Sequence, residues 1–211
     1  MLNQKKEQIL EAAKGVLLKK GIFKTRVEDI TNDLGIAKGS FYTYFKSKDI
    51  LLEEIIERVY KIREEELKVL LKQPLDYKEQ LKLFIIKRFT ISSENLQSHL
   101  ILINLTRNLE HLTPVLREKL LKIEFLNRKF LKEIIKNIQN KNFSDEEIDI
   151  MVIFIMGGIK SYRLERLFFK NADDYFISDI DEFKDRIKAI NLEEEVELVV
   201  NSILKLLTGG N

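Results

Sequence analysis

The chain has 211 residues, 45% of them hydrophobic, which is enough to bury a core and excludes a disordered protein. It contains no cysteine, which excludes disulfides and thiol chemistry, and its first residues lack the apolar core of a signal peptide. The net charge is only +2, but residues 1–50 hold ten Lys or Arg against six Asp or Glu. This distribution suits a nucleic-acid-binding N-terminus, although chance asymmetry in a lysine-rich chain gives the same pattern. The uncharged run 150–159 is about half of a membrane span, so we expect a soluble, cytoplasmic protein.

Helix start and stop signals predict about nine helices, and two prolines with eight glycines favour long helices over strands. The first helix is expected over residues 4–20. A second opens at Thr25, where the Thr25 hydroxyl and the Glu28 carboxylate are predicted to form a capping box. It stops at Gly35, which permits a tight turn, and a third short helix follows over residues 38–45.

The same capping signals place the later helices. Ser47 is predicted to cap a fourth helix of about 25 residues, which ends before Pro74. Residues 171–190 are interpreted as a loop that includes a short helix over residues 179–188. The last five helices are expected to open at Asp76, Glu94, Thr113, Ser144 and Asn191.

Residues 25–46 form a candidate helix-turn-helix, with two short helices joined by a glycine turn. Successive residues of a helix are rotated by about 100°, so Phe41 and Phe45 share the side that faces the core. The opposite side is small and polar apart from one tyrosine, which suits entry into the major groove of DNA. The predicted DNA-contacting residues on this helix are Gly39, Ser40, Tyr42 and Thr43, with Tyr44 at the edge.

Three lysines flank that surface. Lys38 lies near the start of the third helix, where it is placed for a phosphate or a guanine. Lys46 and Lys48 bracket Ser47 at the start of the fourth helix, where exposed amides and the helix dipole attract phosphate. A generic three-helix packing unit, with the aromatic residues as its core, is the alternative at this point.

The segment resembles the DNA-binding domain of the tetracycline-repressor (TetR) family. The resemblance covers about residues 5–55. It is carried by Gly21-Ile22-Phe23, Thr25, Val27-Glu28-Asp29-Ile30, and the run from Gly35 through Ala37, Lys38 and Gly39 to Lys48. It implies an all-α homodimer that usually represses transcription at a double-stranded DNA operator and is released by a small molecule.

The resemblance implies DNA contacts at nine matching positions, which include Thr25 and Arg26 but not Lys46. Ala37 stands where Ser or Thr often caps the recognition helix, and Thr43 stands where His is common. The cap is therefore weaker here, and the base preference can differ. The implied contacts are Thr25, Arg26, Lys38, Gly39, Ser40, Tyr42, Thr43, Tyr44 and Lys48.

The predicted fold is all-α, with an N-terminal three-helix helix-turn-helix DNA-binding domain (1–46) and a C-terminal helical domain (47–211) for ligand binding and dimerisation. The eighth helix is apolar nearly all round, so it must be covered on several sides. Gly157 and Gly158 would let a partner helix approach closely, although packing within the chain is the alternative. Expected dimer contacts on helices eight and nine are Ile155, Gly157, Gly158, Ile159, Val196, Val199, Val200 and Ile203.

An unknown small-molecule effector is expected to bind between helices four and eight. A lone histidine is more often a surface or satisfied core residue than a ligand contact, and two histidines are too sparse for a metal site. No catalytic constellation is present, so neither an enzyme nor a cofactor is expected. The alternative is a DNA-binding regulator that is constitutive or controlled by a protein partner. Candidate ligand-lining residues are Phe84, Arg88, His99, Asn104, Arg107 and Tyr162.

Overall fold

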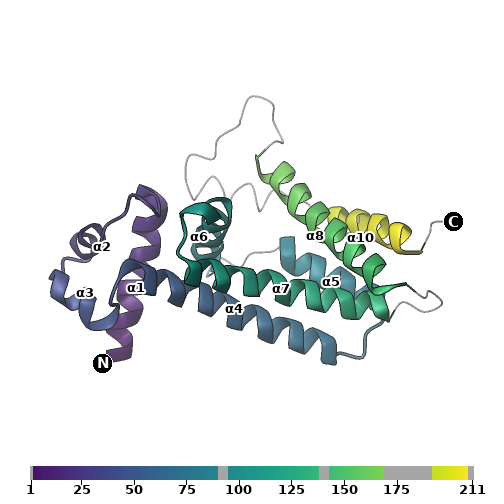
Figure 1. The fold of residues 1–211 in the computed structure, drawn as a ribbon, viewed down its shortest axis with the longest axis horizontal. Helices are drawn as coiled ribbons and strands as arrows, with labels where there is room; N and C mark the ends of the chain where they lie inside the picture. The colour runs from purple at the N-terminus through teal and green to yellow at the C-terminus, as the bar shows by residue number, and fades with distance from the viewer. Residues whose placement is uncertain (1, 90–94, 138–142, 169–191, 209–211) are drawn as a thin grey trace. The chain divides into compact units, whose positions relative to one another are not determined.

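A computed structural model describes residues 2–89, 95–137, 143–168 and 192–208. Within these ranges the chain forms nine α-helices and one short 3-10 helix, without strands, which confirms the predicted all-α fold (Figure 1). The predicted loop 171–190, with its short helix, lies outside the described residues. The elements are α1 (Leu2–Lys20), α2 (Val27–Asp33), α3 (Lys38–Tyr44), α4 (Lys48–Lys72), α5 (Tyr77–Phe89), α6 (Leu96–Arg107), η2 (Leu109–His111), α7 (Pro114–Lys136), α8 (Asp145–Phe168) and α10 (Leu192–Thr208).

Hydrogen bonds in the first turns confirm two of the predicted helix starts. The Oγ of Ser47 accepts a 3.2 Å hydrogen bond from the N–H of Ile50 and so caps α4. At α8 the N–H of Ser144 donates to Glu147 Oε2 at 2.7 Å, and the N–H of Glu147 donates to Ser144 Oγ at 3.2 Å. This reciprocal pair satisfies two amides that the helix itself leaves without partners.

The predicted capping box of Thr25 and Glu28 is wrong. Thr25 is buried in the turn after α1, where its hydroxyl donates a 2.8 Å hydrogen bond to the carbonyl of Gly21. The carboxylate of Asp29 instead accepts a 2.7 Å hydrogen bond from the N–H of Arg26 at the start of α2. A threonine hydroxyl readily bonds a carbonyl four residues earlier, so its presence before a helix does not by itself define the cap.

The chain forms two compact units, each with its own core. Unit 1 takes in residues 1–64 and 92–124, and unit 2 takes in residues 65–91 and 125–211. The helices α4 and α7 contribute to both units, so this division differs from the predicted boundary after residue 46. The helix-turn-helix therefore shares a unit with α6 and with the first part of α7.

The core of unit 1 holds the N-terminal helices together. Ile9 and Leu17 of α1 pack in one buried cluster with Phe41 of α3 and Ile55 of α4. Ile101 of α6 belongs to the same cluster, and α6 packs against α1. This shared core fixes α3 on a rigid support.

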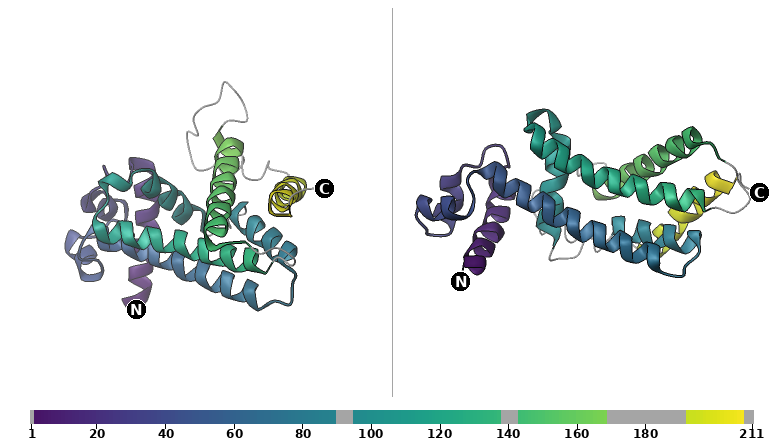
Figure 2. Two further views of the ribbon diagram at one scale, coloured as in Figure 1. Left: turned by 45° about the vertical axis from the view of Figure 1, so that its right-hand side comes forward. Right: turned by 60° about the horizontal axis from the view of Figure 1, so that its bottom comes forward.

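The core of unit 2 centres on α5. Both α8 and α10 pack against α5, and α10 lies beside it in the views of Figure 2. Phe84 and Ile85 of α5 are fully buried there, together with Val152 of α8 and Val200 of α10. None of the described helices combines the length and the apolar character that a bilayer span requires.

Candidate nucleic-acid interface

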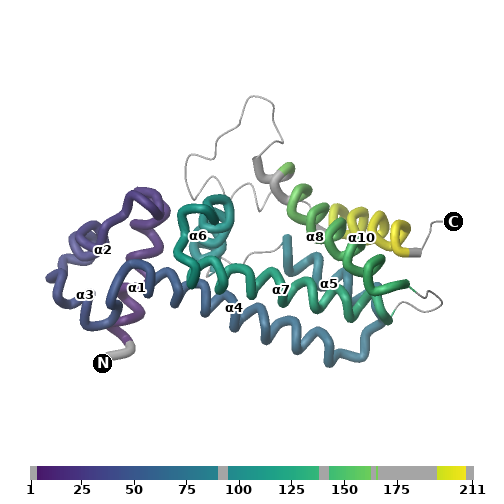
Figure 3. Tube along the Cα trace, in the orientation of Figure 1, coloured from purple at the N-terminus to yellow at the C-terminus, as the bar shows by residue number. Residues whose placement is uncertain are grey.

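A tight turn joins α2 to α3. Gly35 has a φ of +63°, in the left-handed region that glycine adopts without strain. The N–H of Ile36 donates a 3.0 Å hydrogen bond back to the carbonyl of Thr31 and closes the turn. The trace in Figure 3 follows α1, α2 and α3 in succession, and the pair α2–α3 has the form of a helix-turn-helix.

Two phenylalanines hold α3 in place from its inner side. Phe41 and Phe45 are 0% and 1% exposed, and their ring centroids lie 5.7 Å apart. Both rings belong to the cluster that includes residues of α1 and α4. The prediction that these two side chains face the core is confirmed.

The outer side of α3 presents Tyr42 to solvent. This side chain is 45% exposed, and its ring packs edge-on against Phe41 with centroids 5.6 Å apart. The ammonium of Lys38 lies 5.9 Å from the centroid of the Tyr42 ring. An aromatic ring and a cation therefore share the exposed surface that the sequence predicts to contact DNA.

Small residues make up the rest of this surface. Gly39 is exposed, and within the described residues an added Cβ would meet no atom within 4 Å, so DNA could approach the backbone closely. The hydroxyl of Thr43 donates a 3.1 Å hydrogen bond to the Gly39 carbonyl, which leaves the oxygen lone pairs and the methyl group for base edges. Ser40 and Tyr44 are half-buried at the margins.

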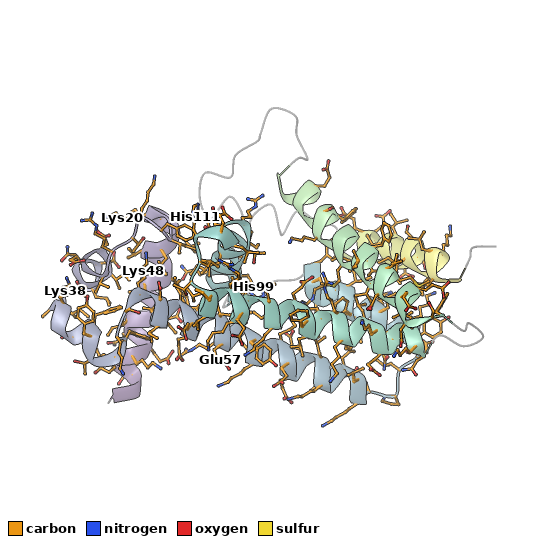
Figure 4. All side chains as sticks on the ribbon, in the orientation of Figure 1. Lys20, Lys38, Lys48, Glu57, His99 and His111 are labelled. Carbon is orange, nitrogen blue, oxygen red and sulfur yellow. The ribbon has the colours of Figure 1, made fainter. Side chains whose placement is uncertain are left out.

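Lys38 forms an ion pair with Glu28 on the surface of the unit, and Figure 4 labels its side chain. The hydrogen bond from Lys38 lowers the pKa of the Glu28 carboxyl, and the same bond raises the pKa of Lys38. Both side chains are half exposed, and exposed ion pairs contribute little free energy. A DNA phosphate can therefore displace Glu28 from Lys38 at little cost.

Lys48 lies in a different environment. Its Nζ donates 2.9 Å hydrogen bonds to the carbonyls of Ile22 and Thr25, and burial lowers the pKa of its ammonium. Lys48 thereby fastens the start of α4 to the turn between α1 and α2. An ammonium group has three N–H donors, so one remains for a phosphate, and that contact stays a prediction.

The other predicted contact residues differ in accessibility. Arg26 and Lys46 are exposed, whereas Thr25 is buried and holds the turn through Gly21. The N-cap residue of α3, Ala37, makes no side-chain cap hydrogen bond, which confirms the weaker cap. Thr25 therefore positions the segment, and its contact with DNA stays a prediction.

A charged cluster that sequence reasoning missed joins α1 to α4. Arg58 donates 2.6 Å hydrogen bonds to both carboxylate oxygens of Glu7 and a 3.0 Å hydrogen bond to Glu54. Lys6 also donates to Glu54, at 3.0 Å. The hydrogen bond from Arg58 lowers the pKa of Glu7. The pair Glu54–Arg58 could be read from its i, i+4 spacing, but Glu7 is too distant in the sequence.

Three predicted ligand-lining residues, Phe84, Arg88 and Tyr162, lie in unit 2. The guanidinium of Arg88 lies 5.0 Å from the ring centroid of Phe84, so the structure brings these two side chains together. Tyr162 donates a 3.0 Å hydrogen bond to Glu195, and its ring packs edge-on against Phe89.

The other three predicted ligand-lining residues lie on α6 in unit 1. Asn104 and Arg107 are exposed. The Nδ1 of His99 lies 2.9 Å from the carbonyl of Asn95, within the same helical turn. Figure 4 labels His99 on this helix. A role for these three residues in ligand binding stays a prediction.

The predicted dimer contacts differ in how exposed they are to solvent. Five of the eight belong to the buried core of unit 2, while Gly157 and Gly158 are exposed and Val199 is half-buried. Their roles in a dimer are untested, but the five buried side chains lie within the chain's own packing. The buried five are Ile155, Ile159, Val196, Val200 and Ile203.

The glycine turn, the buried inner side of α3 and its exposed outer side have the arrangement of a helix-turn-helix DNA-binding domain. Residues 9–55 match the family model described as bacterial regulatory proteins, tetR family. The match covers the helix-turn-helix and parts of its flanking helices α1 and α4, and it does not extend to the rest of the chain.

Three relatives illustrate how far the similarity extends. The HTH-type transcriptional regulator YerO of Bacillus subtilis is 43% identical over 51 residues, 24% of this chain and 18% of that protein. The fatty acid metabolism regulator protein of B. subtilis is 26% identical over 205 residues, 96% and 93% of the two chains. The crystal structure of FadR from B. subtilis in complex with stearoyl-CoA is similar with a TM-score of 0.64, at 25% identity over 97% of this chain and 98% of that chain.

Proposed function

We propose that the protein is a homodimeric transcriptional repressor that acts in the cytoplasm and leaves its DNA operator when a small molecule binds. The observation that supports this proposal is the exposed side of α3, which presents Lys38, Gly39, Tyr42 and Thr43, while Phe41 and Phe45 are buried on its other side. Rigid presentation of such a surface suits the major groove. In a two-fold dimer, two α3 helices about 34–36 Å apart would address half-sites one DNA turn apart.

A second copy of the chain is the proposed partner of the outer stripe of α8. We define this stripe as Ile150, Ile153, Phe154, Gly157 and Gly158, which follow helical spacing and are all exposed. An exposed apolar stripe on a helix whose other side is already buried supports a protein contact. In the described residues an added Cβ at either glycine would meet no atom within 4 Å, so the chain's own packing does not require glycine there.

The exposed apolar residues of α10 extend this argument. Leu198 and Leu206 are exposed on α10, although the helix buries its other side in unit 2. Two helices with an apolar outer side suit a four-helix contact with their symmetry mates.

We expect Phe154→Asp to convert the protein from a dimer to a monomer. Phe154 is 71% exposed in the single chain, so its replacement should leave the fold intact, whereas a buried carboxylate would disrupt an apolar contact between copies. Sedimentation should report a mass near twice 24.9 kDa for the wild type and near 24.9 kDa for the variant. Val69→Asp, at an exposed apolar residue of α4, is the matched control and should remain dimeric. A monomeric wild type would contradict the proposed dimer.

The relative that binds stearoyl-CoA supports a long-chain acyl-CoA as the first effector to test. We expect stearoyl-CoA to release the protein from duplex DNA taken from upstream of its own gene, and acetyl-CoA, which lacks the long chain, to leave the complex intact. A mobility-shift titration measures both. A complex that resists stearoyl-CoA and shorter acyl-CoAs alike would instead favour a regulator that is constitutive or controlled by a protein partner.

A further inference from the structure

Arg88 is a buried cation in the last turn of α5. Only 8% of the residue is exposed, and it lies within unit 2. Its Nη1 donates a 2.9 Å hydrogen bond to Oδ1 of Asn127, which is also buried. Its Nε and Nη2 are buried as well, and they have no hydrogen-bond partner within the part of the chain that the structure describes.

The charge of Arg88 is not balanced by a carboxylate of the described residues. Three described acidic side chains of unit 2 have other partners: Glu197 accepts from Lys82 at 2.5 Å, Glu195 accepts from Tyr162 at 3.0 Å, and Asp149 pairs with Lys132. A guanidinium stays protonated in proteins, so burial cannot neutralise it. A buried cation without a counter-charge is unfavourable, and a negative group that arrives from outside the chain would relieve this cost.

The two nitrogens of Arg88 without a hydrogen-bond partner among the described residues form one edge of the guanidinium. Nε–H and Nη2–H point in parallel from the same side of a guanidinium and match the two oxygens of a carboxylate or phosphate. Asn127 holds the remaining nitrogen, and the Phe84 ring lies 5.0 Å from the guanidinium carbon. These contacts orient the side chain before any ligand binds.

The Phe84 ring beside the Arg88 guanidinium belongs to an aromatic part of the unit 2 core. Phe84 stacks on Phe130 with centroids 5.1 Å apart, and both belong to the core of unit 2. Phe89 and Tyr162 pack edge-on, at 5.5 Å, in the same core. A ligand that reaches Arg88 therefore needs an apolar body as well as an anionic group.

We propose that the Nε–Nη2 edge of Arg88 is the anchor for the carboxylate or phosphate of an amphipathic effector. This inference rests on the proposed function, because it assumes that an effector enters unit 2. It adds the chemical class of that effector and the residue that selects it.

The test compares the binding of anionic and neutral probes to the full-length protein in the absence of DNA. The probes are stearate, stearoyl-CoA, inorganic phosphate and the neutral stearyl alcohol, measured by calorimetry with the three long-chain probes below the concentrations at which they aggregate. We expect an anionic probe to bind wild type about tenfold or more tightly than stearyl alcohol, as charge-assisted bidentate hydrogen bonds allow. Tight binding of stearate alone would identify a carboxylate site, whereas tight binding of stearoyl-CoA or inorganic phosphate would identify a phosphate site.

Variants of Arg88 test whether its paired Nε and Nη2 donors cause the preference for anionic probes. Arg88→Gln should abolish the preference for anionic probes and leave the binding of stearyl alcohol unchanged. Arg88→Lys keeps the positive charge but not the two parallel donors, so it should reduce the preference. Lys87→Gln is the matched control, because Lys87 lies next in the sequence and pairs with Glu66. It should retain the full preference. No anionic preference in wild type, or an undiminished preference in Arg88→Gln, would overturn the proposal.

A stability measurement keeps the proposal testable if a variant folds poorly. In anion-free buffer the Tm of the double variant Arg88→Met, Asn127→Leu should equal or exceed that of wild type, because it removes the unbalanced buried charge together with the acceptor of its hydrogen bond. A Tm several degrees lower would show that Arg88 is satisfied within the chain and would overturn the anchor. Release from DNA is measured separately. Equal release by stearyl alcohol and by stearate would support a small-molecule effector but contradict the role of Arg88 as its anchor. A protein that binds no DNA would contradict the proposed repressor, while the calorimetric test of Arg88 would still apply.

Discussion

Phe41→Ala is expected to destabilise the DNA-binding end of unit 1 by about 3–5 kcal/mol, the range measured when a buried phenylalanine is truncated in a core. The Phe41 side chain is 0% exposed and packs against Phe45 and residues of α1 and α4. Such a loss is a large part of the roughly 5–15 kcal/mol that stabilises a typical domain. Urea unfolding followed by circular dichroism measures the change, and DNA binding should fall with it.

The neighbouring residue supplies the matched control. Tyr42 lies on the same helix but is 45% exposed, so Tyr42→Ala should change the free energy of unfolding by less than about 1 kcal/mol. If Phe41→Ala proved as mild as Tyr42→Ala, then Phe41 would not support α3 and the assignment of inner and outer sides would fail.

Tyr42→Ala should weaken specific DNA binding by about 10- to 100-fold, equivalent to the loss of about 1–3 kcal/mol of base contact, while the protein stays folded. The exposed ring lies on the outer side of α3, near the ammonium of Lys38. Fluorescence anisotropy with duplex DNA from upstream of the gene measures the affinity. Ile62→Ala, at an exposed residue of α4, should bind as wild type does. Unchanged affinity in Tyr42→Ala would exclude the ring from recognition.

Local signals predicted the helices well because capping acts over a few residues. The Ser47 cap of α4 and the reciprocal cap of Ser144 and Glu147 form as the sequence indicates. The side of α3 that faces the core was also predicted correctly, because helical spacing separates Phe41 and Phe45 from Tyr42.

Contacts between residues distant in the sequence could not be predicted. Lys48 donates to the carbonyls of Ile22 and Thr25, and Arg58 binds Glu7 of α1. No local pattern encodes such pairs, since they depend on how α1 packs against α4. The sequence therefore predicted the cations of the N-terminal region but not which of them are already engaged.

The residues of α8 that face the core could also not be predicted from the sequence. Composition indicated that the helix is covered on several sides, but it could not tell which residues face the chain's own core. The structure places Ile155 and Ile159 inside and leaves Ile153 and Phe154 exposed. Arg88 was predicted as a ligand-lining residue, but only the structure shows that it is buried and that its Nε and Nη2 have no hydrogen-bond partner among the described residues.

The most direct test of the central claim is the affinity of the wild-type protein for the DNA upstream of its gene, compared with a random duplex of equal length across a salt series. If α3 reads DNA as proposed, the upstream duplex should bind about a thousandfold or more tightly, and both affinities should fall steeply with salt as phosphate contacts are screened. Equal affinity for the two duplexes at every salt concentration would contradict the account.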